Sequence, residues 1–235
     1  MAINTLLPTA EGNAMTIRRD PIAIARAAAA LLLLAAAAAA GTYYVSPAGS
    51  DQAAGTAPGT AWKTLQHAAD EVAAGDTVIV LPGTYAGFNL FTSGASGAPI
   101  TFTANPGGFD PNPAVVVNTN NGFTGKDRIN LEGASYVVIE GFTVPGTGDP
   151  DTNRTGIRTV GFPDDPARFV TLRANRCDQN GRWGILTGHV DDLLIEDNEC
   201  SRATSDNGAG CRSRIATIVS MRVAPLNGSR AASIS

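Results

Sequence analysis

Charge, lysine and cysteine are all scarce in this chain. Only 16% of its 235 residues are charged, and the formal net charge is −4. Proteins that bind nucleic acid present a basic face, so this balance argues against a nucleic-acid partner. The three cysteines show no CxxC spacing, which leaves a zinc site without support. Lys63 and Lys126 are the only lysines, so the positive charge comes almost entirely from arginine.

A long apolar run is also missing. The Ala/Leu run at 27–40 is shorter than the stretch of about 20 residues that spans a membrane. Basic residues precede this run and small residues end it: Arg18, Arg19, Arg26 and Ala38 to Ala40. We therefore expect residues 1–40 to be a leader and signal peptide, with translation starting at Met15 and cleavage after Ala40. The mature protein would be secreted or periplasmic, with no stable membrane span.

Turn-forming and apolar residues are abundant. The chain has 26 glycines and 14 prolines, and 43% of its residues are hydrophobic. This composition is typical of a turn-rich β protein rather than a helical bundle. The length fits one domain with a long core.

An eight-residue pattern occurs twice, as VTLRANRC at 170–177 and LLIEDNEC at 193–200, with a looser copy, VVIEGFTV, at 137–144. Short Gly-Ile elements at 156–159 and 184–187 precede the two best copies. Repeats of β-branched alternation and Asn/Gly turns indicate strands that stack coil upon coil. The sequence therefore predicts an all-β parallel solenoid of three to four coils.

Period-two alternation assigns the two faces of these repeats. Taking Leu172 and Ile195 as inward places Cys177 and Cys200 inward as well, in one register. The two thiols would be either stacked side by side or bonded, since neighbouring strands lie within disulfide range. Asn175 and Asn198 fall in the turns, where an internal asparagine ladder is the expected structure.

Charged residues occupy the outward positions of the repeats. Two columns form: Glu140, Arg173 and Glu196 in one, and Thr143, Arg176 and Glu199 in the other. Opposite charges at the distance of one strand form cross-strand pairs. We interpret these columns as structural ladders rather than as a catalytic set.

The segment 41–85 precedes the repeats and differs from them. Leu65, Ala68, Ala69 and Val72 have helical spacing, and an apolar strand follows at 77–81. We expect this segment to be an N-terminal cap whose amphipathic helix covers the open end of the core. Shorter strands are predicted at 100–104, 114–117 and 129–131, within a coil region that spans 86–210.

The cap sequence resembles a known family. The motifs YYVS at 43–46, WKTLQ at 62–66, GDTVIV at 75–80 and PGTY at 82–85 are similar to the N-terminal cap of secreted right-handed parallel β-helix proteins of the pectate-lyase superfamily. GASYVVIEGF at 133–142 and NGRWGI at 180–185 also resemble that group. The resemblance covers about 43–210 and implies a right-handed parallel β-helix. It also implies a polysaccharide partner and β-elimination on an acidic glycan such as pectate, although the superfamily includes hydrolases and non-catalytic binders.

A uronate lyase needs a group that neutralises the substrate carboxylate and a base that removes the adjacent proton. Ca²⁺ held by carboxylates would do the first, and a Lys or Arg would do the second. Asp178, Asp191 and Asp192 are the candidate Ca²⁺ ligands, although loop aspartates also cap turns. Neither lysine falls on a regular coil, so the base that the resemblance implies would be an arginine.

Three further residues are candidates for substrate binding. Trp183 and Arg182 flank a Gly-rich turn and would form a sugar-stacking platform with a charged partner, or Trp183 would pack beneath the loop. His189 would serve in acid–base chemistry, or would simply be solvated. No residue is singled out as the catalytic group.

The repeat pattern is interrupted after Gly210. Met221 falls where an asparagine is expected, and residues 211–235 read as an aberrant or disordered tail. We expect that the chain is truncated, or is out of frame from about residue 211. Three functions therefore stay open: a Ca²⁺-assisted lyase, a non-catalytic carbohydrate-binding or surface-display β-helix, and an inactive fragment of an enzyme. A Lys or Arg facing a carboxylate cluster would favour the lyase, and an aromatic-lined groove without such a base would favour the binder.

Overall fold

The computed structural model describes residues 40–108 and 110–201, together with the backbone of 211–212 and 222–223. The predicted leader, except Ala40, and most of the predicted tail lie outside these residues. Within the described part of the chain, no helix is long and apolar enough to cross a membrane.

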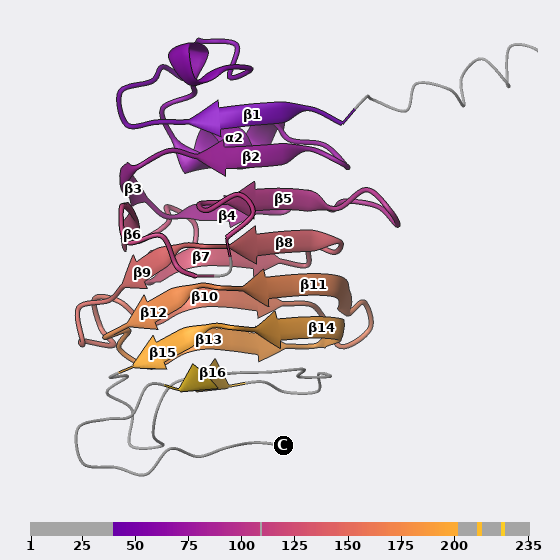
Figure 1. Ribbon diagram of the computed structural model, residues 1–235. Coiled ribbons are helices and arrows are strands. Elements are labelled where there is room, and N and C mark those ends of the chain that lie inside the picture. The colour runs from indigo at the N-terminus through magenta and orange to yellow at the C-terminus, as the bar shows by residue number, and fades with distance from the viewer. Residues whose placement is uncertain (1–39, 109, 202–210, 213–221, 224–235) are drawn as a thin grey trace, which may run out of the picture. The chain divides into compact units, whose positions relative to one another are not determined.

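Three parallel sheets run along the described chain (Figure 1). Sheet A consists of β1 (Thr42–Val45), β2 (Thr77–Val80), β5 (Ile100–Thr103), β8 (Val137–Glu140), β11 (Ala167–Arg173) and β14 (Val190–Glu196). Sheet B consists of β3 (Gly83–Ala86), β6 (Val115–Thr119), β9 (Thr143–Pro145), β12 (Arg176–Asp178), β15 (Glu199–Ser201) and β17 (Arg222–Val223). Sheet C consists of β4 (Phe88–Leu90), β7 (Asp127–Glu132), β10 (Thr155–Val160), β13 (Trp183–Gly188) and β16 (Cys211–Arg212).

Each coil contributes one strand to sheet A, then one to sheet B, then one to sheet C. Among the described residues five coils contribute a strand to each sheet, from β2–β4 to β14–β16, against the three to four predicted, and β17 adds a further strand to sheet B. In Figure 1 the strands of sheet A point left in front, the chain returns behind them through sheet C, and each later coil lies lower. This is a right-handed path, so the predicted right-handed parallel β-helix is confirmed.

The columns of the core follow the alternation of the sequence. Val137, Val170 and Leu193 pair in register across three coils, and every one of them is buried. Ile139, Leu172 and Ile195 form the next inward column in the same way. The inward assignment of these residues is therefore confirmed.

The turns between sheets A and B contain the asparagine ladder. Asn175 Nδ2 donates to the carbonyl of Ile139 at 2.9 Å and to Asn198 Oδ1 at 3.0 Å. Asn198 Nδ2 donates to the carbonyl of Leu172 at 2.7 Å. Both amides are fully buried, so each satisfies backbone groups that water cannot reach. The ladder was predicted and is confirmed.

Ion pairs join the outward columns as expected. Arg173 contacts Glu140 in the preceding coil and Glu196, at 3.5 Å, in the following one. Arg176 lies 3.7 Å from Glu199. Because every acceptor is already opposite an arginine of a neighbouring strand, these charges stabilise the stack rather than form a catalytic set.

Cys177 and Cys200 lie side by side in β12 and β15. Cys177 carries a free, buried thiol, and burial raises its pKa. Cys200 is disulfide-bonded, so its bond does not involve Cys177. The predicted stacking of the two residues in one register is therefore confirmed, and the alternative of a bond between them is wrong, because the Cys177 thiol is free.

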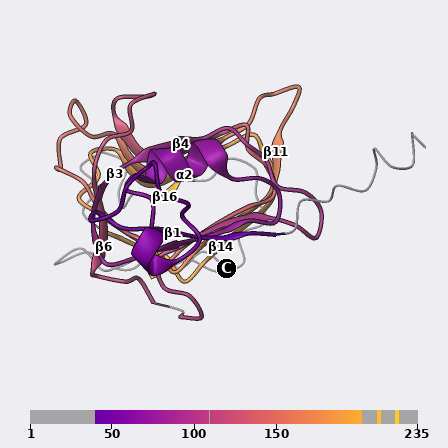
Figure 2. The ribbon, with the colours of Figure 1, turned by 90° about the horizontal axis from the view of Figure 1, so that it is seen from above.

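The cap contains the predicted helix, α2 (Leu65–Glu71), after a short 3-10 turn, η1 (Pro58–Thr60). Thr64 caps α2, since its hydroxyl accepts a hydrogen bond from the N–H of His67 at 3.1 Å. Leu65, Ala68 and Ala69 of α2 are buried in the core. Viewed from above in Figure 2, α2 lies beside β4. β2 and β3 already pair with strands of the next coil, so the stack begins inside the segment assigned to the cap.

Candidate functional site

A groove of about 730 Å³ lies where the start of α2, strands β3 and β4, and the loop before β7 meet. The side chains that line it are mostly aromatic, amide-bearing or hydroxylic. They include Lys63, Gln66, Asn89, Phe91, Asn120 and Phe123. We call this site the cap groove.

Two exposed phenylalanines form one wall of the cap groove. The Phe91 side chain is 57% exposed and the Phe123 side chain is 60% exposed. Their rings meet edge to face, with centroids 5.1 Å apart. Phe91 directly follows β4, and Phe123 comes from the loop between β6 and β7. In an edge-to-face pair at least one ring face stays uncovered by the partner ring. A flat, apolar ligand surface can stack on that face.

Asn89 lies in the floor of the cap groove with an unpaired donor. It is only 3% exposed, and its Oδ1 accepts a hydrogen bond from Asn130 Nδ2 in the next coil. Gln66 of α2 forms two hydrogen bonds with the Asn89 backbone. Its Oε1 accepts from the Asn89 N–H at 2.9 Å, and its Nε2 donates to the Asn89 carbonyl at 3.1 Å. The Nδ2 atom of Asn89 has no hydrogen-bond partner. A buried donor without a partner is uncommon, but this atom has almost no solvent-accessible surface, so a ligand acceptor would reach it only after the covering side chains moved.

Polar side chains continue from Asn89 along the outer face of sheet C. Arg158 donates to Asn130 Oδ1 at 2.6 Å and pairs with the carboxylate of Glu132. Both charged groups are largely shielded from solvent. Since these charges already neutralise each other, the strip supports the floor of the cap groove rather than adding a free charge to it.

Charge in the cap groove is positive and limited to one residue. Lys63 lines it, and none of the described lining residues is an aspartate or glutamate. Glycoside hydrolysis uses a pair of carboxylic acids flanking the substrate, and the cap groove lacks that pair. Its composition fits recognition of hydroxyl and carboxylate oxygens.

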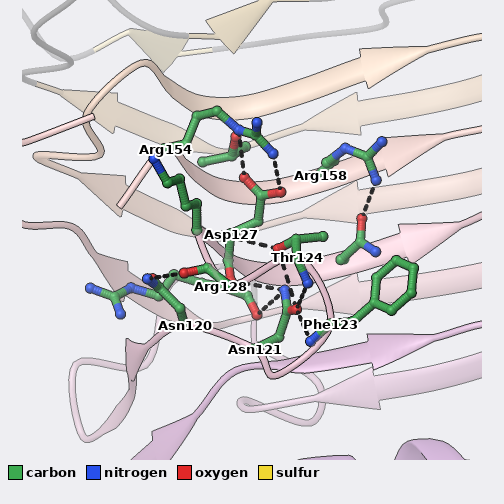
Figure 3. A network of polar contacts seen from close by, with 12 residues as sticks. Asn120, Asn121, Phe123, Thr124, Asp127, Arg128, Arg154 and Arg158 are labelled. Carbon is green, nitrogen blue, oxygen red and sulfur yellow. Dashed lines mark hydrogen bonds and ion pairs between the residues drawn. The ribbon is translucent and has the colours of Figure 1, made fainter. Parts of the chain in front are cut away.

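The loop that carries Phe123 is held by a dense polar network (Figure 3). Asn121 Oδ1 accepts hydrogen bonds from the N–H groups of Phe123 and Thr124, at 3.0 and 2.8 Å. Asp127 closes the loop and binds the Arg154 guanidinium of the next coil, with Nη2 at 2.9 Å. The Phe123 ring is therefore presented from a fixed backbone although the side chain itself is exposed.

Arg128 is a buried cation next to this loop. It is 4% exposed, its Nε atom has no hydrogen-bond partner, and burial lowers its pKa to about 10. Its backbone lies against Gly87, where an added Cβ would come within 2.0 Å of the Arg128 carbonyl oxygen. Arg128 is not among the residues that line the cap groove, so it does not present its charge to a ligand there.

The predicted substrate-binding residues do not converge. Arg182 and Trp183 lie at the start of β13, and both N–H groups donate to the carbonyl of Arg154. His189 follows the other end of β13 and is exposed. None of the three lines the cap groove. Trp183 is partly buried. This is compatible with both predicted roles, a sugar-stacking platform and packing beneath the loop.

The predicted calcium ligands lie on different sheets. Asp178 ends β12 in sheet B, where its Oδ1 accepts a hydrogen bond from Ser201 Oγ at 2.5 Å. Asp191 is the second residue of β14 in sheet A, 3.8 Å from Arg168, and Asp192 has a left-handed φ of 53°. β13 separates the two sites along the chain. Among the described residues no three His, Cys, Asp or Glu side chains come together in a way that could hold a metal, so the structure does not gather these three aspartates and a calcium ion stays a prediction.

The cap groove was not predicted from the sequence. Its one local signal is the string FNLF at 88–91, where alternation places Phe88 and Leu90 inward and Phe91 outward with Asn89. A phenylalanine on the outward face of a strand end is a candidate ligand contact. No corresponding pattern identifies Phe123, because it lies in a loop.

The comparisons with known proteins agree with the architecture. No family model matches the chain. An uncharacterized protein of Bacillus subtilis (strain 168), YwoF, is 29% identical over 173 residues, which cover 68% of this chain and 36% of YwoF. The chain thus spans about a third of the length of this curated relative.

Solved structures of similar shape are parallel β-helix proteins. Pectate lyase Pel9A matches with a TM-score of 0.54 and 18% identity, over 69% of this chain and 40% of that chain. A GH136 lacto-N-biosidase from Eubacterium ramulus matches with a TM-score of 0.51 and 15% identity, over 69% of this chain and 34% of that chain. At such identities the likeness shows the fold alone. The chain therefore shares the parallel β-helix fold with these two proteins.

Proposed function

We propose that the protein binds an acidic polysaccharide in the cap groove. The observation that carries the proposal is the exposed Phe91–Phe123 pair in a groove that is also lined by amide side chains. Sugar rings stack their apolar faces on aromatic side chains. Their hydroxyl oxygens accept hydrogen bonds from amide donors, and the side chains of Gln66, Asn89 and Asn120 line the groove.

Lys63 gives the proposal its preference for acidic sugars. It is the single charged residue among those that line the cap groove, and it carries an ammonium group at neutral pH. A uronate carboxylate would pair with this group, whereas the groove presents no carboxylate to repel it. The names of the two structural neighbours, a pectate lyase and a lacto-N-biosidase, support a carbohydrate ligand in general.

β-Elimination is the second candidate, because Lys63 is an amine in the same groove as the aromatic pair. As a lyase the protein would use Lys63 as the base, and an ion such as Ca²⁺ would neutralise the substrate carboxylate. The described residues that line the groove include no carboxylate cluster opposite Lys63. Binding without cleavage is therefore the better-supported function.

The test separates the two candidates in one set of samples. The 235-residue chain is titrated calorimetrically with polygalacturonate and with a neutral glucan, with and without Ca²⁺. The ultraviolet absorbance of the unsaturated elimination product is followed in parallel. We expect saturable binding of polygalacturonate without a rise in absorbance, and weaker binding of the glucan.

Two variants complete the design. Phe123→Ala should weaken binding by about tenfold, whereas Phe162→Ala removes a phenylalanine that is 51% exposed but does not line the groove, and should bind normally. A Ca²⁺-dependent rise in absorbance that Lys63→Gln abolishes would establish the lyase instead. No binding of either glycan would overturn the proposal. Export from the cytoplasm, predicted from the leader, stays a prediction.

A further inference from the structure

We infer that Arg154, which does not line the cap groove, positions the Phe123 ring from the next coil. The inference rests on the proposed function, because it assigns Arg154 a part in the binding proposed for that groove. Arg154 directly precedes β10 in the third coil, whereas Phe123 lies in the loop between β6 and β7 of the second. The contacts between these coils form a continuous path from one residue to the other.

The first step of the path is a closed turn built around one buried amide. Asn121 is 2% exposed, and its Oδ1 holds the N–H groups of Phe123 and Thr124. Its backbone N–H and its Nδ2 both donate to the carbonyl of Asp127, each at 2.8 Å. These bonds fix the backbone on both sides of Phe123. The position of the ring therefore follows the positions of Asn121 and Asp127.

The second step is the ion pair between Asp127 and Arg154. The Asp127 side chain is fully buried, and its two carboxylate oxygens accept from Arg154 Nε at 3.3 Å and Nη2 at 2.9 Å. Figure 3 shows the guanidinium facing the carboxylate in this two-pronged arrangement. A bidentate pair fixes direction as well as distance. Arg154 thus sets the place of Asp127, and Asp127 sets the loop.

Backbone and amide contacts tie the same two coils together. The N–H of Arg154 donates to the carbonyl of Lys126 at 2.6 Å. Asn120 Nδ2 donates to the carbonyl of Thr152 at 2.5 Å, and Asn120 itself lines the cap groove. The groove wall from the second coil is therefore anchored on the loop before β10 rather than standing alone.

Loss of the Arg154 guanidinium would leave the Asp127 carboxylate buried without a partner. An unpaired buried charge is strongly unfavourable, so the carboxylate would move toward water and take the loop with it. A ligand would then have to order the loop when it binds, which lowers affinity without any change in the groove residues themselves. Arg154 is in this sense a positioning residue.

A double-mutant cycle on the full chain tests the inference, with polygalacturonate as the ligand. We expect Arg154→Gln to weaken binding by about tenfold in the wild-type background. In the Phe123→Ala background the same change should have an effect of less than about twofold, because the ring it positions is gone. Equal losses in both backgrounds would overturn the inference. Arg176→Gln, which removes the exposed pair with Glu199, is the matched control and should not change affinity.

A second readout does not depend on any glycan. Amide hydrogen exchange of the segment 121–127 should accelerate in Arg154→Gln and stay unchanged in Arg176→Gln. If Arg154→Gln does not fold, Arg154→Lys keeps the charge but not the two-pronged geometry, and should give a smaller acceleration. Unchanged exchange in both Arg154 variants would overturn the inference. Accelerated exchange together with no glycan binding by the wild type would overturn the proposed function and leave the link between Arg154 and Phe123 supported.

Discussion

The Phe123 ring meets the Phe91 ring edge to face at 5.1 Å, although the two residues belong to different coils. The contact joins the end of β4 to the loop before β7 and leaves both side chains more than half exposed. Because exposed aromatic pairs bury little area within the fold, they contribute little to the free energy of unfolding. Their value for a ligand that stacks is larger.

Removal of either ring should therefore affect binding and not stability. We expect Phe91→Ala and Phe123→Ala each to weaken polygalacturonate binding by about 1.5 kcal/mol, about twelvefold. The melting temperature should stay close to the wild-type value, because exposed substitutions seldom change stability. Calorimetric titration and thermal unfolding of the same samples check both statements. A lower melting temperature with unchanged affinity would identify the pair as structural.

The unpaired donor of Asn89 allows a nearly isosteric test. Asn89→Asp keeps an Oδ1 acceptor for Asn130 but replaces the Nδ2 donor with a carboxylate oxygen. We expect the affinity for polygalacturonate to fall by about tenfold or more, because the substitution adds a negative charge to the lining of the groove and this charge repels the uronate carboxylates. Asn118→Asp, at an exposed position outside the groove, is the matched control and should bind as the wild type does.

The asparagine ladder should contribute to stability and not to binding. Asn175→Ala leaves the carbonyl of Ile139 and the N–H of Phe142 without their side-chain partner. Each unsatisfied buried group costs about 1–3 kcal/mol, so we expect the free energy of unfolding to fall by at least about 2 kcal/mol. Urea unfolding followed by circular dichroism measures this loss. An equal loss in the exposed control Asn118→Ala would contradict the assignment.

Acid should weaken the cap through Asp51. Burial alone would raise the pKa of Asp51, but hydrogen bonds from the N–H groups of Thr64 and Lys63 outweigh it and hold this pKa below its ordinary value. Because the folded-state pKa is the lower one, the stabilisation is complete above the unfolded-state pKa of about 4. It is lost as the pH falls through the folded-state value. Between about pH 5 and pH 2, wild-type stability should therefore fall more steeply than that of Asp51→Asn. Parallel pH profiles of the two proteins would refute the assignment.

Local alternation was sufficient to predict the stack itself. Leu172 and Ile195 fall inward, Asn175 and Asn198 fall in the turns, and Arg173 falls between two glutamates, all as the repeat implies. These relationships depend on one register between neighbouring coils. A slip of one residue would turn every inward side chain outward, so burial alone selects the register.

The positions of the predicted site residues relative to one another depend on the shape of a whole coil. Asp178 and Asp191 are close in sequence, and the repeat does not reveal that β13 forms a third sheet between them. Arg182 and Trp183 do lie at the same edge of sheet C as Asp127, in the register Asp127–Thr155–Trp183. These two predicted residues therefore lie at the edge of sheet C that carries Asp127, but two coils further along the β-helix.

The order of residues therefore determines the strands, the inward and outward faces and the ladders, because each follows from a short repeat and from the burial of one face. The meeting of Phe91, Phe123 and Asn89 beside α2 is decided only in three dimensions. It depends on the length of the loop before β7, on the Asp127–Arg154 pair that holds this loop, and on the packing of α2 beside β4. Contacts of this kind join distant parts of the chain, and no local pattern encodes them.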